Sequence, residues 1–173
     1  MLMLFAPWFS SVAVAQDITK PQITDMSVGT PVTGHDYTIL VNVVDDVAIN
    51  YTRLYVYFII PGGISNPEYI IMNLTGIHQY QTAIQIPQNA SKLRYTIYAY
   101  DTSNNANISD VISKDVADDQ DPVAVCSISI TLTMGINCTF DGSASTDNIG
   151  INNFTWSFPY DGGTISLFGP SPT

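Results

Sequence analysis

Short runs in which apolar and polar residues alternate, separated by turn residues, constrain the fold of this chain more than any other feature. In KLRYTIYAYD, residues 92–101, the apolar positions are Leu93, Tyr95, Ile97 and Ala99. A period of two places these side chains on one face of a β-strand. No amphipathic helical run of useful length follows residue 16, and fourteen of the fifteen acids are Asp, which favours turns over helices. The pattern predicts an all-β protein.

Seven such runs lie between residues 17 and 116, and turn residues separate them at regular intervals. This spacing is typical of a β-sandwich of the immunoglobulin-like type. We therefore expect strands at residues 21–28, 37–44, 53–60, 68–74, 80–87, 92–101 and 110–116.

The polar, acidic stretch at residues 115–122 interrupts this rhythm. We place a linker at 117–121, between a sandwich at 17–116 and a second domain at 122–173. A shift of 102 residues aligns the two domains and brings Asp45 onto Asp147 and Leu54 onto Trp156. In both domains an acidic turn then precedes a strand with a large apolar residue at its centre. The prediction is two tandem Ig-like β-sandwiches, the second incomplete.

The second domain resembles a PKD domain, the polycystic-kidney-disease-type Ig-like repeat, over residues 121–158. The resemblance rests on Asp141-Gly142-Ser143-Ala144-Ser145, on Asp147, and on Phe154-x-Trp156-x-Phe158. Where the family usually has a Gly-Asp-Gly turn, this chain reads PYDGG at 159–163. The family's last strands are also missing, so we expect a partial PKD domain belonging to a longer polypeptide.

The first domain resembles the Ig-like or fibronectin-III-like repeats that accompany PKD domains in microbial surface proteins. Lys20-Pro21, Asp45-Asp46 and the run Tyr95-x-Ile97-x-Ala99-x-Asp101 carry this resemblance. Such repeats act as spacers, adhesion modules or surface-layer units, or as accessory domains of secreted hydrolases. The resemblance therefore implies a structural or adhesive surface protein, with the non-catalytic region of a secreted hydrolase as the alternative.

The first sixteen residues predict export. An apolar stretch from Leu2 to Phe9 precedes Ala13-Val14-Ala15, a pattern that fits signal-peptidase cleavage before Gln16. A plain strand or a short membrane anchor is the alternative, and the stretch is too short to span a bilayer. We expect a secreted or cell-surface glycoprotein with no transmembrane span here. Six N-x-[ST] sequons are candidate glycosylation sites: Asn50, Asn73, Asn89, Asn107, Asn137 and Asn153.

The two cysteines, Cys126 and Cys138, are expected to form a disulfide in an exported protein. Their positions in two alternating runs place both on one face of the sheet. Such a bridge stabilises a fold by about 3 kcal/mol on the chain-entropy account. Simple hairpin register does not place them opposite each other, so the bridge requires a bend in the first strand. Two buried thiols are the alternative.

The charge balance excludes several partners. The formal net charge is −10, with only five lysines and arginines. Nucleic acids and anionic membranes need a basic surface, so neither is an expected partner. The two histidines, His35 and His78, lie in no catalytic or zinc-binding motif, and no serine has a nucleophile motif. We predict a protein that is not an enzyme. Its expected partners are other surface proteins, glycans and adjacent modules of the same chain.

Calcium is the one cofactor that the sequence suggests. Oxygen ligands cluster at the predicted domain joint, where a calcium ion would stiffen the linker. Asp45, Asp46 and Asp101 are expected at the corresponding end of the first domain. Turn formation by these side chains, through bonds to their own backbone, is the alternative. The candidate ligands at the joint are Asp118, Asp119, Asp121, Asp147 and Asn148.

Four tyrosines are candidates for a ligand-binding face. Tyr55 and Tyr57 point outward on one predicted strand, and Tyr98 and Tyr100 point outward on a predicted neighbour. Together they could stack sugars or dock another module, which makes a carbohydrate-binding module a further functional hypothesis. The alternative is cross-strand aromatic pairing that only stabilises the sheet, by about 0.2–1 kcal/mol per pair.

Overall fold

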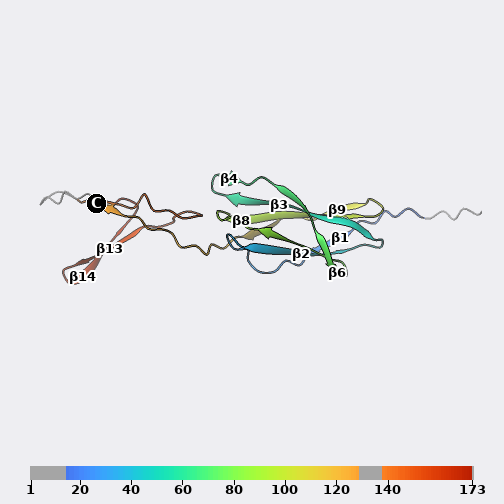
Figure 1. The fold of residues 1–173 in the computed structure, drawn as a ribbon, viewed down its shortest axis with the longest axis horizontal. Coiled ribbons are helices and arrows are strands. Elements are labelled where there is room, and N and C mark those ends of the chain that lie inside the picture. Colours follow the sequence, from blue (N-terminus) through green and yellow to red (C-terminus); the bar gives the residue numbers. More distant parts are fainter. Residues whose placement is uncertain (1–14, 129–137, 173) are drawn as a thin grey trace, which may run out of the picture.

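The computed structural model describes residues 15–128 and 138–172. This part of the chain is all-β, as predicted, and contains no helix. Its first module carries ten strands and its second module four. Figure 1 shows the two modules as successive parts of the ribbon. The ten strands are β1 (Gln22–Asp25), β2 (Asp36–Val44), β3 (Ile49–Ile60), β4 (Gly63–Ile64), β5 (Glu68–Ile71), β6 (Asn73–Gly76), β7 (Gln79–Gln85), β8 (Lys92–Asp101), β9 (Ala106–Ile108) and β10 (Ile112–Asp115).

The first module consists of two antiparallel sheets. The first sheet has the order β1-β2-β7-β6. In the second sheet, β10, β8 and β3 lie side by side, β4 and β5 pair with β3, and β9 pairs with β8. Written as strands A to G, this is ABED facing GFC, the arrangement of an immunoglobulin constant-type sandwich.

A single hydrophobic core lies between these sheets. The inward positions of β8 are those that the alternation predicts: Leu93, Tyr95, Ile97 and Ala99 are fully buried. They meet alternate residues of β2 from the opposite sheet, which include Ile39. Burying large aliphatic and aromatic side chains stabilises a fold by about 1.5–3 kcal/mol each, so this layer holds the two sheets together.

One predicted strand is divided between the two sheets. Residues 68–74 were expected to form a single strand, but β5 pairs with β3 in the second sheet and β6 pairs with β7 in the first. Met72 lies between the two strands and its side chain is buried in the core. A chain that crosses from one sheet to the other must turn its backbone, and an apolar residue at the crossing covers the edge of the core.

In the second module, β11 (Ser127–Ile128) pairs with β12 (Phe140–Asp141), and β13 (Thr155–Tyr160) pairs with β14 (Gly163–Phe168). Within 122–128 and 138–172 these are two separate two-stranded sheets. Asp161 and Gly162 join β13 to β14 with φ values of 46° and 75°. Two consecutive positive φ values define the turn type that suits the twist of a β-hairpin. The PYDGG sequence is therefore a hairpin turn.

The two modules share the acidic turn that the 102-residue shift predicts. Asp45 accepts a hydrogen bond from the Val47 amide at 3.2 Å, through its side-chain oxygen. Asp147 likewise accepts from the Ile149 amide at 3.0 Å and from the Gly150 amide at 2.7 Å. In both places the aspartate stabilises a bend before the next long strand, β3 or β13.

Gly142 of the DGSAS motif lies against two aromatic rings. A Cβ atom at this position would come within 3.1 Å of both Phe154 and Trp156. Trp156 also packs on Phe140, with ring centroids 5.6 Å apart, and its indole N–H donates to the Gly169 carbonyl at 2.9 Å. Trp156 is half-buried. The glycine of the motif therefore allows the backbone to lie directly against the ring of Trp156.

The predicted disulfide is not formed. Cys126 is exposed and Cys138 is half-buried, and no bond joins them. The strand register explains this result, because Ser127 pairs with Asp141 and Ile128 with Phe140. Continuing that register by one residue places Cys126 opposite Gly142, four residues from Cys138 and well beyond the reach of a disulfide.

Two further expectations concern the ends of the first module. Ala117, which we assigned to the linker, forms a parallel bridge with Val32, so ordered pairing extends one residue further than predicted. The predicted signal peptide at 1–16 falls almost entirely outside the described residues. In the part of the chain that the structure describes, no helix has the length and apolar character needed to cross a membrane.

Candidate ligand face and acidic cluster

The four tyrosines predicted to share a face do so on the second sheet. In the pairing of β3 with β8, Tyr55 lies opposite Thr96 and Tyr57 opposite Arg94. Further along, the register places Tyr98 opposite Arg53 and Tyr100 opposite Tyr51. The four residues thus form a diagonal stripe instead of a two-by-two block.

Two further tyrosines and both arginines of the chain complete this surface. Tyr51 stacks on Tyr100 with a centroid distance of 4.6 Å, and Tyr69 of β5 lies 4.8 Å from Tyr55. We call this surface the tyrosine face, and it comprises Tyr51, Arg53, Tyr55, Tyr57, Tyr69, Arg94, Tyr98 and Tyr100.

The sequence could have indicated some of the missed members. Tyr51 and Arg53 continue the outward alternation of Tyr55 and Tyr57, and Arg94 continues that of Tyr98. We expected the strand to begin at residue 53, so Tyr51 was left out. Tyr69 joins the face only because β5 pairs with β3, and no local pattern specifies that pairing.

Arg53 is enclosed by its neighbours on the tyrosine face. Its guanidinium carbon lies 4.9 Å from the ring centroid of Tyr69, 5.1 Å from that of Tyr98 and 5.7 Å from that of Tyr100. Its Nη2 also donates to the Tyr100 hydroxyl at 3.5 Å. Cation–π contacts of this kind contribute about 0.5–2 kcal/mol. These contacts therefore stabilise this half of the face.

The other half of the face contains a groove. Tyr55, Tyr57, Arg94 and Thr96 line it, with Ile64, Pro67 and Val111 at its rim. The side chains of Ile64 and Val111 are 63% and 59% exposed. Exposed apolar side chains beside aromatic rings make this groove a candidate contact surface.

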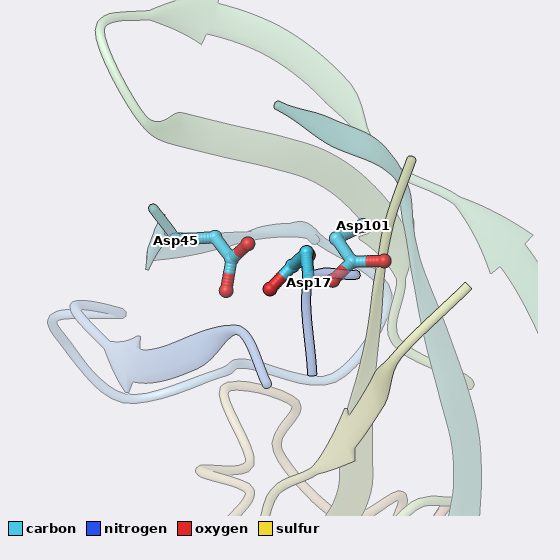
Figure 2. Close-up of side chains that lie close together, drawn as sticks. All are labelled: Asp17, Asp45 and Asp101. Carbon is cyan, nitrogen blue, oxygen red and sulfur yellow. The ribbon is translucent and has the colours of Figure 1, made fainter. Parts of the chain in front are cut away.

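Three carboxylates lie close together at the end of the first module where the chain enters it. Asp17 precedes β1, Asp45 lies in the turn after β2, and Asp101 ends β8. One oxygen from each lies within 4.8 Å of the other two. Figure 2 shows the three side chains directed toward one another. The sequence predicted Asp45 and Asp101 here, together with Asp46 instead of Asp17.

Local hydrogen bonds hold two of these carboxylates in place. Asp101 is fully buried and accepts from the backbone and side-chain nitrogens of Asn105, both at 2.7 Å. Asp17 accepts from the Thr19 amide at 2.9 Å and from the Asn105 side chain at 3.2 Å. The Thr19 bond is the main cause that lowers the pKa of the Asp17 carboxyl.

Asp45 is the least satisfied member of the cluster. Its Oδ1 is inaccessible to solvent and has no hydrogen-bond donor among the described residues. Burial raises the pKa of this carboxyl, and the charges of Asp46, Asp101 and Asp17 act in the same direction. A site that gathers carboxylate oxygens and leaves one without a donor has the chemistry of a hard-cation site, and calcium prefers six to eight oxygen ligands.

The five residues predicted as calcium ligands at the joint are only partly brought together. Asp118 accepts from the Asn148 side chain at 3.0 Å, and this bond is the main cause that lowers the pKa of Asp118. Asp119 pairs with His35 at 2.9 Å. Asp147 is bonded to its own turn, and Asp121 is exposed. The Asn148 amide also donates to the Gln88 carbonyl at 2.7 Å, so it connects the two modules.

The remaining predicted positions lie on the surface. His78 is exposed, in a turn with a φ of 61°. Asn50, Asn73, Asn89 and Asn153 are exposed. Asn107 is half-buried, and its amide nitrogen donates to the Pro21 carbonyl at 2.8 Å, so that nitrogen is occupied. Asn137 lies outside the described residues.

An apolar cleft lies in the second module, where the two small sheets approach each other. Aromatic rings from both sheets, those of Phe140, Trp156 and Phe158, line it with Val125 and Ile128. These residues are the ones expected to form the core of the second domain. The cleft is therefore part of the core of the second module.

No protein-family model and no curated protein matches this chain. The resemblance to PKD and Ig-like repeats consequently depends on the residues quoted above.

Proposed function

We propose that the chain is a secreted or cell-surface protein built of Ig-like and PKD-type modules, and that it binds an external partner through the tyrosine face. One observation carries the proposal: six tyrosines and both arginines share one outer sheet face in a chain with a net charge of −10. Aromatic residues and arginine are enriched where proteins bind partners, whereas lysine and acids are depleted there.

The test is binding of the full chain to extracellular polysaccharides and to intact cells. A variant with Tyr55, Tyr57, Tyr98 and Tyr100 all replaced by Thr should lose at least tenfold in affinity, because both the stacking area and the rigid aromatic surface are removed. Thr favours strands, so the sheet is retained. Circular dichroism checks the fold of this variant. Unchanged binding would leave the tyrosines with a purely structural role.

The acidic cluster supports a second proposal, in which calcium stiffens the first module. Asp17, Asp45 and Asp101 would hold the ion, because their oxygens converge and Asp45 Oδ1 lacks a donor. Bound calcium would neutralise mutual repulsion and fix the segment before β1 to the ends of β2 and β8. A spacer whose entry segment is fixed in this way transmits direction along a chain of modules.

A further inference from the structure

The two guanidinium groups of the tyrosine face differ in their contacts. Arg53 lies over three tyrosine rings and donates to the Tyr100 hydroxyl, whereas Arg94 has no ring contact and no hydrogen-bond acceptor among the described residues. The Nε atoms of both arginines are buried without an acceptor. Among the described residues, the basic side chains that contact a carboxylate are His35, with Asp119, and Lys92, with Asp115, so Arg94 has no carboxylate partner. An anion bound in the groove would give the rest of the Arg94 guanidinium an acceptor that no described residue supplies.

The shape of the groove restricts the kind of anion. Arg94 lies opposite Tyr57 in the strand register, and the Tyr55 ring lies 6.0 Å from the Tyr57 ring, tilted by 59°. One guanidinium is thus bordered by two aromatic rings and by the apolar rim of Ile64, Pro67 and Val111. A ligand that fits must carry an anionic group for the guanidinium and an apolar face for the rings.

The two aromatic rings and the single guanidinium distinguish between the possible anions. Nucleic acids bind through many phosphate contacts at once, which one guanidinium does not supply. An acidic peptide side chain offers a carboxylate but no rigid apolar ring face for the two tyrosines. An acidic sugar carries one carboxylate or sulfate on a ring whose C–H face is apolar.

We propose that this groove binds an anionic sugar residue of a polysaccharide, with Arg94 holding the acidic group and Tyr55 and Tyr57 contacting the sugar ring. This inference rests on the proposed function of the tyrosine face and specifies its ligand class. Arg53 stays inside its stack of tyrosines and supports the face without contacting the sugar.

The experiment is calorimetric titration of the full chain with three probes of equal length: hexagalacturonate, a sulfated galactan hexamer and uncharged hexagalactose. We expect one of the two charged probes to bind at least tenfold more tightly than hexagalactose, and which one does so identifies the acidic group. Arg94→Gln should weaken that binding at least tenfold. Lys92→Gln is the matched control, since Lys92 lies two residues earlier on the same face of β8, outside the groove, and should change binding less than twofold.

Three results would overturn the inference. Equal binding of hexagalactose and the charged probes would leave the tyrosine face a sugar-binding surface but remove the role of the acidic group. Binding of poly-L-glutamate with no binding of any hexasaccharide would assign the groove to an acidic protein segment. Equal losses in Arg94→Gln and Lys92→Gln would reduce the effect to net charge. If the fourfold Thr variant also binds cells as well as wild type does, the proposed function itself fails.

Discussion

At the scale of single residues, a hydrogen bond from a buried tyrosine joins the two sheets of the first module. Tyr95 of β8 is fully buried, and its hydroxyl donates to the Asp25 carboxylate of β1 at 2.9 Å. Burial is the main cause that raises the pKa of Tyr95 well above its usual value, and the Asp25 charge adds to it. The folded protein therefore keeps this proton at a pH at which the unfolded chain has lost it.

The stability of the first module should consequently fall in alkali. Below about pH 10, the usual tyrosine value, folded and unfolded states both hold the proton. Above it the unfolded state binds fewer protons, so the free energy of unfolding decreases by up to about 1.4 kcal/mol per pH unit. Urea unfolding between pH 9 and pH 11 should show a shallower decrease for Tyr95→Phe than for wild type. Tyr57→Phe is the control, and parallel profiles for all three proteins would contradict the assignment.

Gly142 supplies the second prediction at residue scale. The rings of Phe154 and Trp156 occupy the space that a methyl group would need. Gly142→Ala should therefore destabilise the second module by about 1–3 kcal/mol, the usual cost of overpacking. Trp156 fluorescence during denaturation, in a Trp8→Phe background, measures it. Gly76→Ala meets only the flexible Gln79 side chain and serves as the control. Equal stability of the two variants would show that the rings move aside.

At the scale of elements, the alternation predicted β8 to the residue, β2 to within one residue and β7 to within two, because each has one buried face and one outer face. The alternation did not predict which sheet a strand joins where tertiary pairing determines it. The run at 68–74 keeps its strand character on both sides of Met72, so its sequence cannot show that its halves join different sheets. The acidic cluster was predicted without Asp17, because that residue precedes β1 and enters the cluster only through folding.

The acidic cluster also predicts a response to calcium at this scale. With millimolar Ca²⁺ in place of a chelator, the melting temperature of the wild-type chain should rise, because an ion that binds only the folded state stabilises it. Asp45→Asn keeps the acceptor for the Val47 amide but removes the charge, and should weaken calcium binding at least tenfold. The exposed neighbour Asp46 provides the control variant, Asp46→Asn. An unchanged melting temperature at all calcium concentrations would leave the aspartates with a turn-forming role.

At the scale of the whole molecule, the first module is a complete two-sheet sandwich, and Asn148 links it to the second module. Within the sandwich, the acidic cluster belongs to the end where the chain enters, whereas the tyrosine face covers the outer side of the second sheet. In the function that we propose, this separation allows the acidic cluster to stiffen the module while the tyrosine face contacts a partner. The proposed function therefore depends on the tyrosine face being the contact surface.

Tyrosine nitration followed by mass spectrometry tests that claim most directly. The full chain would be modified with and without saturating hexagalacturonate, or the sulfated hexamer if that probe binds. We predict that the rates at Tyr55 and Tyr57 fall several-fold with ligand, while the buried Tyr95 stays unreactive in both conditions. Unchanged rates at Tyr55 and Tyr57 under conditions where the ligand is bound would place the contact elsewhere and contradict the account.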